Sequence, residues 1–482
     1  MFKGCLFMNA FFSRGFMVTM TIYAGIHFIE FFHPSGRLED FLSLMGMAAL
    51  LFAFLHTRMR QMTLPLCLTL SAMAIMLITS SGSAFFHGLW EGLRQMRALV
   101  GLLFIVPIVS WVLRYEPYIE DVMIFFRKQL NGSKRFYGGV MAVIQIINYF
   151  VLIGTIPIMY QFVHTFLKGK KGEVWETYRT SAVMRGFALG TLWIISIPSF
   201  SYAIQSTGAS LTLAILQGFL VTVAGIILAL IFLHVQEKRG GLDLSAGIQE
   251  EIDRVLKDGS PHGLVKQKVI EFMTLFVSLF GSILVIHLIF HWDLLVVIPL
   301  VVLGWTLIYF LIKGNLVRFL QESKYYVLRG IPLKAKEMSI FLSAGLLIYA
   351  LNASGWGQIV VEGIYQLTDG IPGFNFLWVL PLIVVMLGLM GLSPLTVMVL
   401  LGGIVQSIDL PYPPELILLS LTMGSVITIL LSPLVIPVII ISNENGRTPW
   451  QNAFKSNWAY AIVFYFVVET YAQCMLWLGV LS

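Results

Sequence analysis

Long apolar runs separated by short polar segments dominate the chain from Phe16 to Val480. A helix that crosses the ~30 Å hydrocarbon core of a bilayer needs about 20 mainly apolar residues. Most of the runs approach that length, and the segment 237–268 is the only sizeable polar stretch between them. The pattern predicts an all-α polytopic membrane protein with about eleven transmembrane helices.

Two of these apolar runs are interrupted by glycine and proline. The run 136–166 contains the sequence GTIP at Gly154–Pro157, and the run 374–406 contains GLSP at Gly391–Pro394. Backbone that leaves a helix at membrane depth exposes unpaired N–H and C=O groups, which only protein or a water-filled cavity can satisfy. Both interruptions are therefore candidate positions for a ligand site.

Each interrupted run is followed along the chain by a second one, 181–204 after the first and 415–441 after the second. Here the interruptions consist of serine and proline. Interrupted apolar segments at corresponding positions of two halves are the best sequence indication of a transporter binding site. The interrupting residues are Ser196, Pro198, Ser432 and Pro433.

The distribution of Lys and Arg predicts how the two runs enter the membrane. Short basic loops mark the cytoplasmic side. The run 136–166 has a basic segment on each side, Arg127–Arg135 and Lys168–Arg185, whereas the run 374–406 is flanked by segments without Lys or Arg. One crossing would place the flanks on opposite sides, and two crossings would need about 40 residues. We therefore expect two re-entrant hairpins, the first entering from the cytoplasm and the second from outside.

The order of these segments predicts two inverted repeats. Amphipathic segments at Glu116–Leu130 and Trp356–Leu367 precede the two hairpins, and corresponding features lie about 240 residues apart. The segment 84–97 fits less well, because an external loop is expected there and it carries Arg94 and Arg97. The predicted parts are an N-terminal span (1–40), a first repeat (41–233), a cytoplasmic linker (234–268) and a second repeat (269–482). The N-terminus is expected inside and the C-terminus outside the plasma membrane.

Composition narrows the function further. The chain is 58% hydrophobic and 12% charged, and its net charge of +6 lies mainly in loops, where it reports orientation rather than binding to nucleic acid. There is no P-loop or GxGxxG motif, so ATP-driven transport by this chain alone is not expected. The three cysteines have neither disulfide nor metal-site spacing. No enzyme motif lies at the end of a span.

The arrangement of hairpins, interrupted spans and amphipathic segments resembles the divalent-anion/sodium symporters of the ion-transporter superfamily, over about Phe41 to Val480. The resemblance implies a homodimer in which a transport domain moves against a scaffold, as in an elevator. In those symporters the hairpin tips carry Ser-Asn-Thr, which binds sodium and the substrate carboxylate. Here Thr155 and Ser393 can supply hydroxyls, but both tips lack the asparagine, and Asn148 is the candidate substitute.

Four chain breaks that meet at mid-membrane would direct helix N-termini, hydroxyls and free carbonyls into one cavity. Such a site suits a small anion with a cation, Na⁺ or H⁺, beside it. The alternative is that the prolines are ordinary kinks relieved by neighbouring serines. The candidate substrate- and ion-binding residues are Asn148, Gly154, Thr155, Pro157, Ser196, Pro198, Ser199, Gly391, Ser393, Pro394, Ser432 and Pro433.

Glu469 is the deepest acidic residue of the apolar spans, within the sequence FYFVVETYAQ of the last one. A carboxyl group at that depth is costly and is a functional hypothesis by default, here as a proton-coupling site. The alternative is a neutral group that hydrogen-bonds to a neighbour.

The sequence as a whole predicts a secondary active transporter of a small, carboxylate-type organic anion, driven by a cation gradient. Two alternatives stay open. One is an inorganic ion exchanger or oxyanion efflux protein, which would place Glu469 at its centre. The other is a lipid-handling protein of the cell envelope, for which opposed hairpins would have no evident purpose.

Overall fold

The computed structural model describes residues 2–115, 118, 122, 125, 132–240, 244–257, 262–369, 374–406, 408 and 410–479. Over these residues the chain is helical and contains no strand. Ten segments of the described chain are long and apolar enough to cross a membrane, and three shorter apolar helices accompany them. The chain is therefore an all-α, multi-pass membrane protein. The amphipathic segment expected at 116–130 lies largely outside the described residues.

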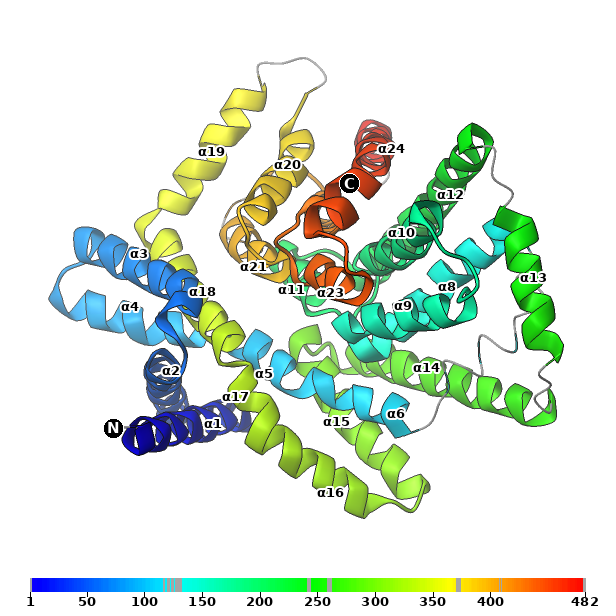
Figure 1. Ribbon diagram of the computed structural model, residues 1–482. Helices are drawn as coiled ribbons and strands as arrows, with labels where there is room; N and C mark the ends of the chain where they lie inside the picture. Colours follow the sequence, from blue (N-terminus) through cyan, green and yellow to red (C-terminus); the bar gives the residue numbers. More distant parts are fainter. Residues whose placement is uncertain are drawn as a thin grey trace. The chain divides into compact units, whose positions relative to one another are not determined.

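The chain divides into two compact units, and each takes residues from both predicted repeats. Unit 1 comprises Met1–Trp111, Ile283–Gly370 and Val399–Leu410. Its helices, drawn in Figure 1, are α1 (Phe2–Phe32), α2 (Gly36–His56), α3 (Thr63–Thr79), α4 (Gly82–Arg94), α5 (Arg97–Ile105), α15 (Leu294–Ile312), α16 (Leu316–Tyr325), α17 (Ile331–Leu333), α18 (Ala335–Ser354) and α19 (Trp356–Asp369). Short turns of helix occur at η1 (Met59–Gln61), η2 (Val106–Val109) and η4 (Tyr326–Gly330).

Unit 2 comprises Val112–Ser282, Ile371–Met398 and Pro411–Ser482. Its helices are α8 (Ser133–Val151), α9 (Thr155–Phe166), α10 (Glu173–Gly190), α11 (Pro198–Thr207), α12 (Leu211–Gly240), α13 (Leu244–Lys257), α20 (Phe376–Leu389), α22 (Pro414–Leu431), α23 (Ile436–Asn445) and α24 (Ser456–Leu478), with short turns at η3 (Leu152–Gly154) and η5 (Gln451–Lys455). Three helices extend across the boundary between the units: α6 (Ser110–Tyr115), α14 (His262–Phe290) and α21 (Pro394–Val405).

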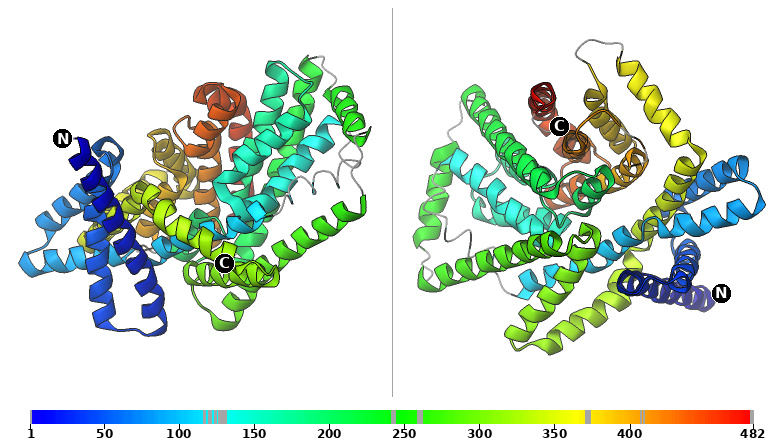
Figure 2. Two further views of the ribbon diagram at one scale, coloured as in Figure 1. Left: turned by 60° about the horizontal axis from the view of Figure 1, so that its bottom comes forward. Right: turned by 180° about the vertical axis from the view of Figure 1, so that it is seen from behind.

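Unit 1 is built around one helix pair and one group of three helices. Helices α1 and α2 pack side by side, and α18 packs against α3 and α4 (Figure 2). Gly92 permits the close approach of α4 to α18, because a Cβ atom there would lie 2.9 Å from the backbone of Leu346. A hydrogen bond from the Thr69 hydroxyl to Ser343, 2.9 Å long, joins α3 to α18 within this apolar contact.

The arginines of the segment 84–97 have acidic partners inside unit 1. Arg94 forms ion pairs with Glu39 at 2.6 Å and with Glu91 of its own helix, and Arg97 lies 3.4 Å from Glu30. The segment is mostly helical rather than a loop, because it consists of most of α4 and a single turn that leads into α5. Paired charges lower the cost of burying arginine, which a count of apolar residues alone cannot reveal.

Two helix pairs of the same kind form the centre of unit 2. Helix α8 packs against α10, and α20 packs against α22. A glycine allows each approach: a Cβ at Gly186 would lie 3.2 Å from the backbone of Met141, and one at Gly424 would lie 2.6 Å from Cβ of Val384. The two glycines are 238 residues apart, from 186 to 424, which agrees with the spacing of the predicted repeats.

One sequence-based expectation about a polar segment is wrong. The basic segment Lys168–Arg185 is a loop only as far as Gly172, because α10 begins at Glu173 and buries both Arg179 and Arg185. The stretch 234–268 is mostly helical, since it contains the end of α12, all of α13 and the start of α14. The side chains of Arg179 and Arg185 form hydrogen bonds with protein neighbours, although the one-dimensional pattern indicates solvated positions for both.

Gly424→Ala is expected to lower the free energy of unfolding of the protein by about 1–3 kcal/mol, because the new methyl group overlaps Val384 and the Pro381 carbonyl. The matched control is Gly281→Ala in α14, where nothing lies within 4 Å of the new methyl group. That substitution should be neutral or stabilising by about 0.4–1 kcal/mol. Thermal unfolding in detergent measures both, and equal effects would contradict the close packing of α20 on α22.

Candidate functional site

The first predicted hairpin turn contains a break between two helices. Helix α8 ends at Val151, η3 follows, and α9 begins at Thr155. Leu152 has φ = 52°, an uncommon value for a side chain other than glycine that carries a conformational cost. Pro157 lies in the first turn of α9, where its missing N–H leaves no hydrogen bond unmade. The break is therefore local, and the chain on both sides of it is regular.

Asn148 and Thr155, on either side of this break, carry buried polar atoms without a partner. Both residues are 0% exposed. The Asn148 amide donates from Nδ2 to the carbonyl of Phe187 at 3.2 Å, but its Oδ1 atom has no hydrogen-bond partner, and neither has Oγ1 of Thr155. Gly190 makes room for this amide, since a Cβ there would lie 2.6 Å from Nδ2. Buried oxygen atoms left in this way are rare and call for an explanation such as a ligand or ion.

The second predicted turn is differently arranged. Gly391 has φ = 98°, which favours glycine, and α21 begins at Pro394. The Ser393 hydroxyl lies 2.7 Å from that of Thr396 and accepts a hydrogen bond from the Thr396 N–H at 3.2 Å. These are the contacts of a helix N-cap. At this tip the predicted hydroxyl is satisfied within its own helix.

Each interrupted helix is hydrogen-bonded to an arm of the preceding run through one serine. Ser196, in the break between α10 and α11, donates to the carbonyl of Tyr149 at 2.8 Å. Ser432, in the break between α22 and α23, donates to the carbonyl of Gly388, also at 2.8 Å. The serines are 236 residues apart and their acceptors 239. The two bonds thus occupy equivalent positions of the predicted repeats.

All twelve predicted binding residues belong to unit 2. The structure brings Asn148 and Thr155 to one break and ties Ser196 to the same helix end, while Pro198 opens α11 with Ser199 buried beside it. Ser432 and Pro433 form the break that precedes α23. No hydrogen bond among the described residues joins the first tip to the second. Contact between the two halves of the unit is made instead by α10 and α11 against α22, and by α9 against α23.

Arg185 is a buried residue of this unit that the sequence pattern misplaces. It is 2% exposed, donates from Nε to Asn457 at 3.1 Å, and lies with its guanidinium carbon 4.5 Å from the centre of the Tyr460 ring. A further bond, from Nη1 to the hydroxyl of Tyr137, joins α10 to α8. One sequence signal for a helical Arg185 is its spacing of four from Ser181, which places two polar residues on one face of a helix.

Glu469 lies on α24 and is fully buried, as its position in the last apolar run indicates. Its Oε1 atom accepts a hydrogen bond of 2.7 Å from Gln473, one turn further along the helix, and its Oε2 atom has no partner. Neither Glu469 nor Gln473 has a recorded bond to a residue of the two breaks. The carboxyl group is therefore a separate feature of unit 2.

No protein-family model matches the chain, and no curated protein is detectably similar to it in sequence. Around the first break the available groups are an amide oxygen, a hydroxyl and the start of a helix, all uncharged. Oxygen atoms of this kind coordinate hard cations such as Na⁺, and the start of a helix carries a partial positive charge that attracts an anion.

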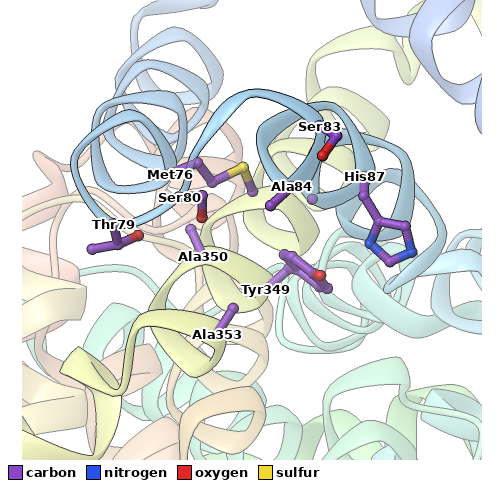
Figure 3. Close-up of a pocket in the computed structure, with 10 residues that line it drawn as sticks. Met76, Thr79, Ser80, Ser83, Ala84, His87, Tyr349, Ala350 and Ala353 are labelled. Carbon is purple, nitrogen blue, oxygen red and sulfur yellow. The ribbon is translucent and has the colours of Figure 1, made fainter.

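A cavity of about 510 Å³ lies in unit 1. It is bounded by the turn between α3 and α4 and by α18, with Tyr349 and His87 among its lining side chains (Figure 3). Its other polar groups are the hydroxyls of Thr79, Ser80 and Ser83. None of the predicted binding residues lines it, so it plays no part in the site of unit 2.

Ser196→Ala should lower the free energy of unfolding by about 1–3 kcal/mol, because it leaves the carbonyl of Tyr149 without its serine donor. Ser432→Ala should lower it by about 0.5–1.5 kcal/mol, because the carbonyl of Gly388 loses one hydrogen bond but still accepts from the N–H of Gly391 at 3.1 Å. Ser278→Ala is the matched control. Its hydroxyl bonds to the carbonyl of Leu275 on an exposed helix face, and the change should stay within about 0.5 kcal/mol. The measurement is thermal unfolding of the purified variants. Two site variants as stable as the control would show that the serine bonds do not hold the breaks.

Proposed function

We propose that this protein is a secondary active transporter of a small, carboxylate-type organic anion, driven by a cation gradient. The ligand site is formed in unit 2 by the two interrupted runs and the two interrupted helices that follow them. Unlike a chain of simple spans, unit 2 contains four helix interruptions, and each of them falls within an apolar segment. Transporters use such interruptions to coordinate substrates and ions near the centre of the bilayer.

The observation that carries the proposal is the pair of unpartnered oxygen atoms at the first break, Oδ1 of Asn148 and Oγ1 of Thr155. Burying a polar group without a hydrogen bond costs of the order of 1–3 kcal/mol, so two such atoms at one helix break need a compensating role. A bound ion or ligand supplies it. Ordinary proline kinks do not, because neighbouring groups satisfy their polar atoms.

The helix starts in this unit favour an anion. The N-terminus of a helix is equivalent to roughly half a positive charge, and α9, α11, α21 and α23 each begin at a break. The predicted binding residues include no Lys or Arg, so dipoles and hydroxyls would hold the anion and a coupling cation would balance its charge. Na⁺ and H⁺ are both compatible with this arrangement.

The division into units supports a scaffold and a moving domain. Unit 2 contains all the predicted binding residues, and unit 1 contains none. In the proposed cycle both apolar runs are re-entrant hairpins and unit 2 carries the ligand across the membrane in an elevator-type motion. Unit 1 is then the fixed scaffold and forms the homodimer. The N-terminus lies inside and the C-terminus outside the plasma membrane.

Thr155→Val should abolish anion-dependent stabilisation without weakening the empty protein. The change keeps the shape of the side chain and removes a hydroxyl that has no partner, so the stability of the unliganded protein should be unchanged or higher. In wild type, an anion present at 100 times its dissociation constant should stabilise the protein by about 2.7 kcal/mol. The measurement is thermal unfolding with succinate, citrate, phosphate and arsenate, each with Na⁺ or with choline and at two pH values.

Thr222→Val is the matched control, because its buried hydroxyl donates to the carbonyl of Leu189 at 3.0 Å. This variant should be less stable than wild type but keep the full shift with the anion. Stabilisation by phosphate or arsenate alone would favour the inorganic ion alternative. A shift that survives in Thr155→Val, or no shift with any of the anions, would contradict the proposed site.

A further inference from the structure

Glu469 is a buried carboxyl group without a charged partner. Its side chain is fully buried near the middle of α24, and none of the described Lys, Arg or His side chains forms an ion pair with it. One oxygen atom accepts from Gln473, and the other accepts nothing. An ionised carboxylate held by one neutral hydrogen bond is far more costly to bury than the neutral acid. This environment therefore favours the protonated form.

The groups around Glu469 offer no compensating charge. Tyr465, on the same helix, is the titratable residue that interacts with it electrostatically. Helix α20 has no titratable side chain, and the only one on α22 is Glu415, which accepts from the N–H of Ser210. The charged groups of α10, α12 and η5 lie toward the start of α24, where Arg185 contacts Asn457, about 18 Å along the helix from Glu469. Among the side chains that the structure describes, these groups are Glu173, Glu176, Arg179, Arg185, His234, Glu237, Lys238 and Lys455.

A pair of side-chain amides connects Glu469 to α20. Nε2 of Gln473 donates both to Glu469 and, at 3.1 Å, to Oδ1 of Asn375, whose own Nδ2 donates back to Gln473 at 2.7 Å. Asn375 is the N-cap of α20 and accepts from the N–H of Leu377 at 3.1 Å. The carboxyl group, two amides and the first turn of α20 thus form one continuous hydrogen-bonded chain.

Helices α20 and α24 contain a second unpartnered atom, which is a hydrogen-bond donor rather than an acceptor. The indole N–H of Trp378 on α20 is buried and donates to nothing, while the hydroxyl of Tyr465 on α24 donates to the Trp378 carbonyl at 2.8 Å. A free donor and a free acceptor thus lie on two packed helices, and buried groups of this kind call for an explanation.

We propose that Glu469 binds the coupling proton of the transporter, and that Gln473 and Asn375 transmit the loss of that proton to α20. The inference rests on the proposed transport function for the role of the proton in coupling. The protonated carboxyl group holds α24 against α20. Deprotonation transfers the proton from the carboxyl oxygen to a water molecule and leaves a buried negative charge, which is relieved when the contact opens to water. Opening breaks the amide pair and releases the cap of α20, the first arm of the second interrupted run.

Infrared spectroscopy of the full-length protein in liposomes tests the proton itself and requires no substrate. Wild type should show the C=O stretch of a buried, protonated carboxylic acid, which disappears as the pH is raised. Glu469→Gln should lack this band, whereas Glu444→Gln, which changes an exposed carboxylate bonded to Gln161, should retain it. A spectrum that is the same in wild type and Glu469→Gln at every pH would overturn the proposal.

Hydrogen–deuterium exchange of the first turn of α20 tests the transmission. In wild type, exchange should rise with pH by up to about tenfold per pH unit beyond the rise seen in Glu469→Gln, because opening follows deprotonation. Gln473→Leu keeps the carboxyl group and breaks the amide pair. It should retain the infrared band but exchange rapidly at every pH, which keeps the test independent of the folding of Glu469→Gln.

Parallel exchange profiles in wild type and Glu469→Gln would overturn the role of Asn375 and Gln473. Anion binding is measured separately through the thermal shift, and Glu469→Gln should keep that shift and lose its dependence on pH. A protein that shows the carboxylic acid band but no anion shift would contradict the proposed transport function and leave the protonated Glu469 established.

Discussion

The whole arrangement of unit 2 depends on the need to pair every backbone N–H and C=O group inside a bilayer. Helices meet this need along their length and fail at their ends. Unit 2 contains four helix interruptions within apolar segments, and two serines supply donors to carbonyls at helix ends, Ser196 to Tyr149 and Ser432 to Gly388. Because each bond also joins an interrupted helix to the preceding arm, the same contacts that satisfy the breaks hold the pairs together.

Glycines allow the paired helices of unit 2 to pack closely, and one of them leaves space for an asparagine side chain. Gly186 and Gly424 let the backbones of paired helices approach closely, and Gly190 leaves space for the amide of Asn148. At the first break, some polar groups therefore have hydrogen-bond partners and others do not. Oδ1 of Asn148 and Oγ1 of Thr155 remain without partners. A structural role accounts for the satisfied contacts. The unpartnered oxygen atoms fit the proposed ligand site, and they lie beside the first break rather than the second.

Much of the fold follows from the apolar pattern, because helix breaks beside Gly154 and Gly391 need only local rules for glycine and for the prolines that follow. The positions of two arginines could not be predicted from the apolar pattern. Arg94 and Arg185 read as loop residues, yet acidic side chains in unit 1 and amides with an aromatic ring in unit 2 hold them inside. Such partners lie far apart in sequence, as Arg185 and Asn457 do. For the same reason the amide pair of Asn375 and Gln473 could not be foreseen, whereas Glu469 stood out by its charge alone.

The accessibility of the flanks of each interrupted run tests the proposed opposed hairpins most directly. Single cysteines would replace Lys134, Lys168, Phe374 and Pro411 in a chain without native cysteines, and an impermeant thiol reagent would label each from one face of the membrane at a time. The account predicts that positions 134 and 168 react from the cytoplasmic face only, and that positions 374 and 411 react from the opposite face only. Labelling of 134 and 168 from different faces would show that the first run crosses the membrane once, and would contradict the account.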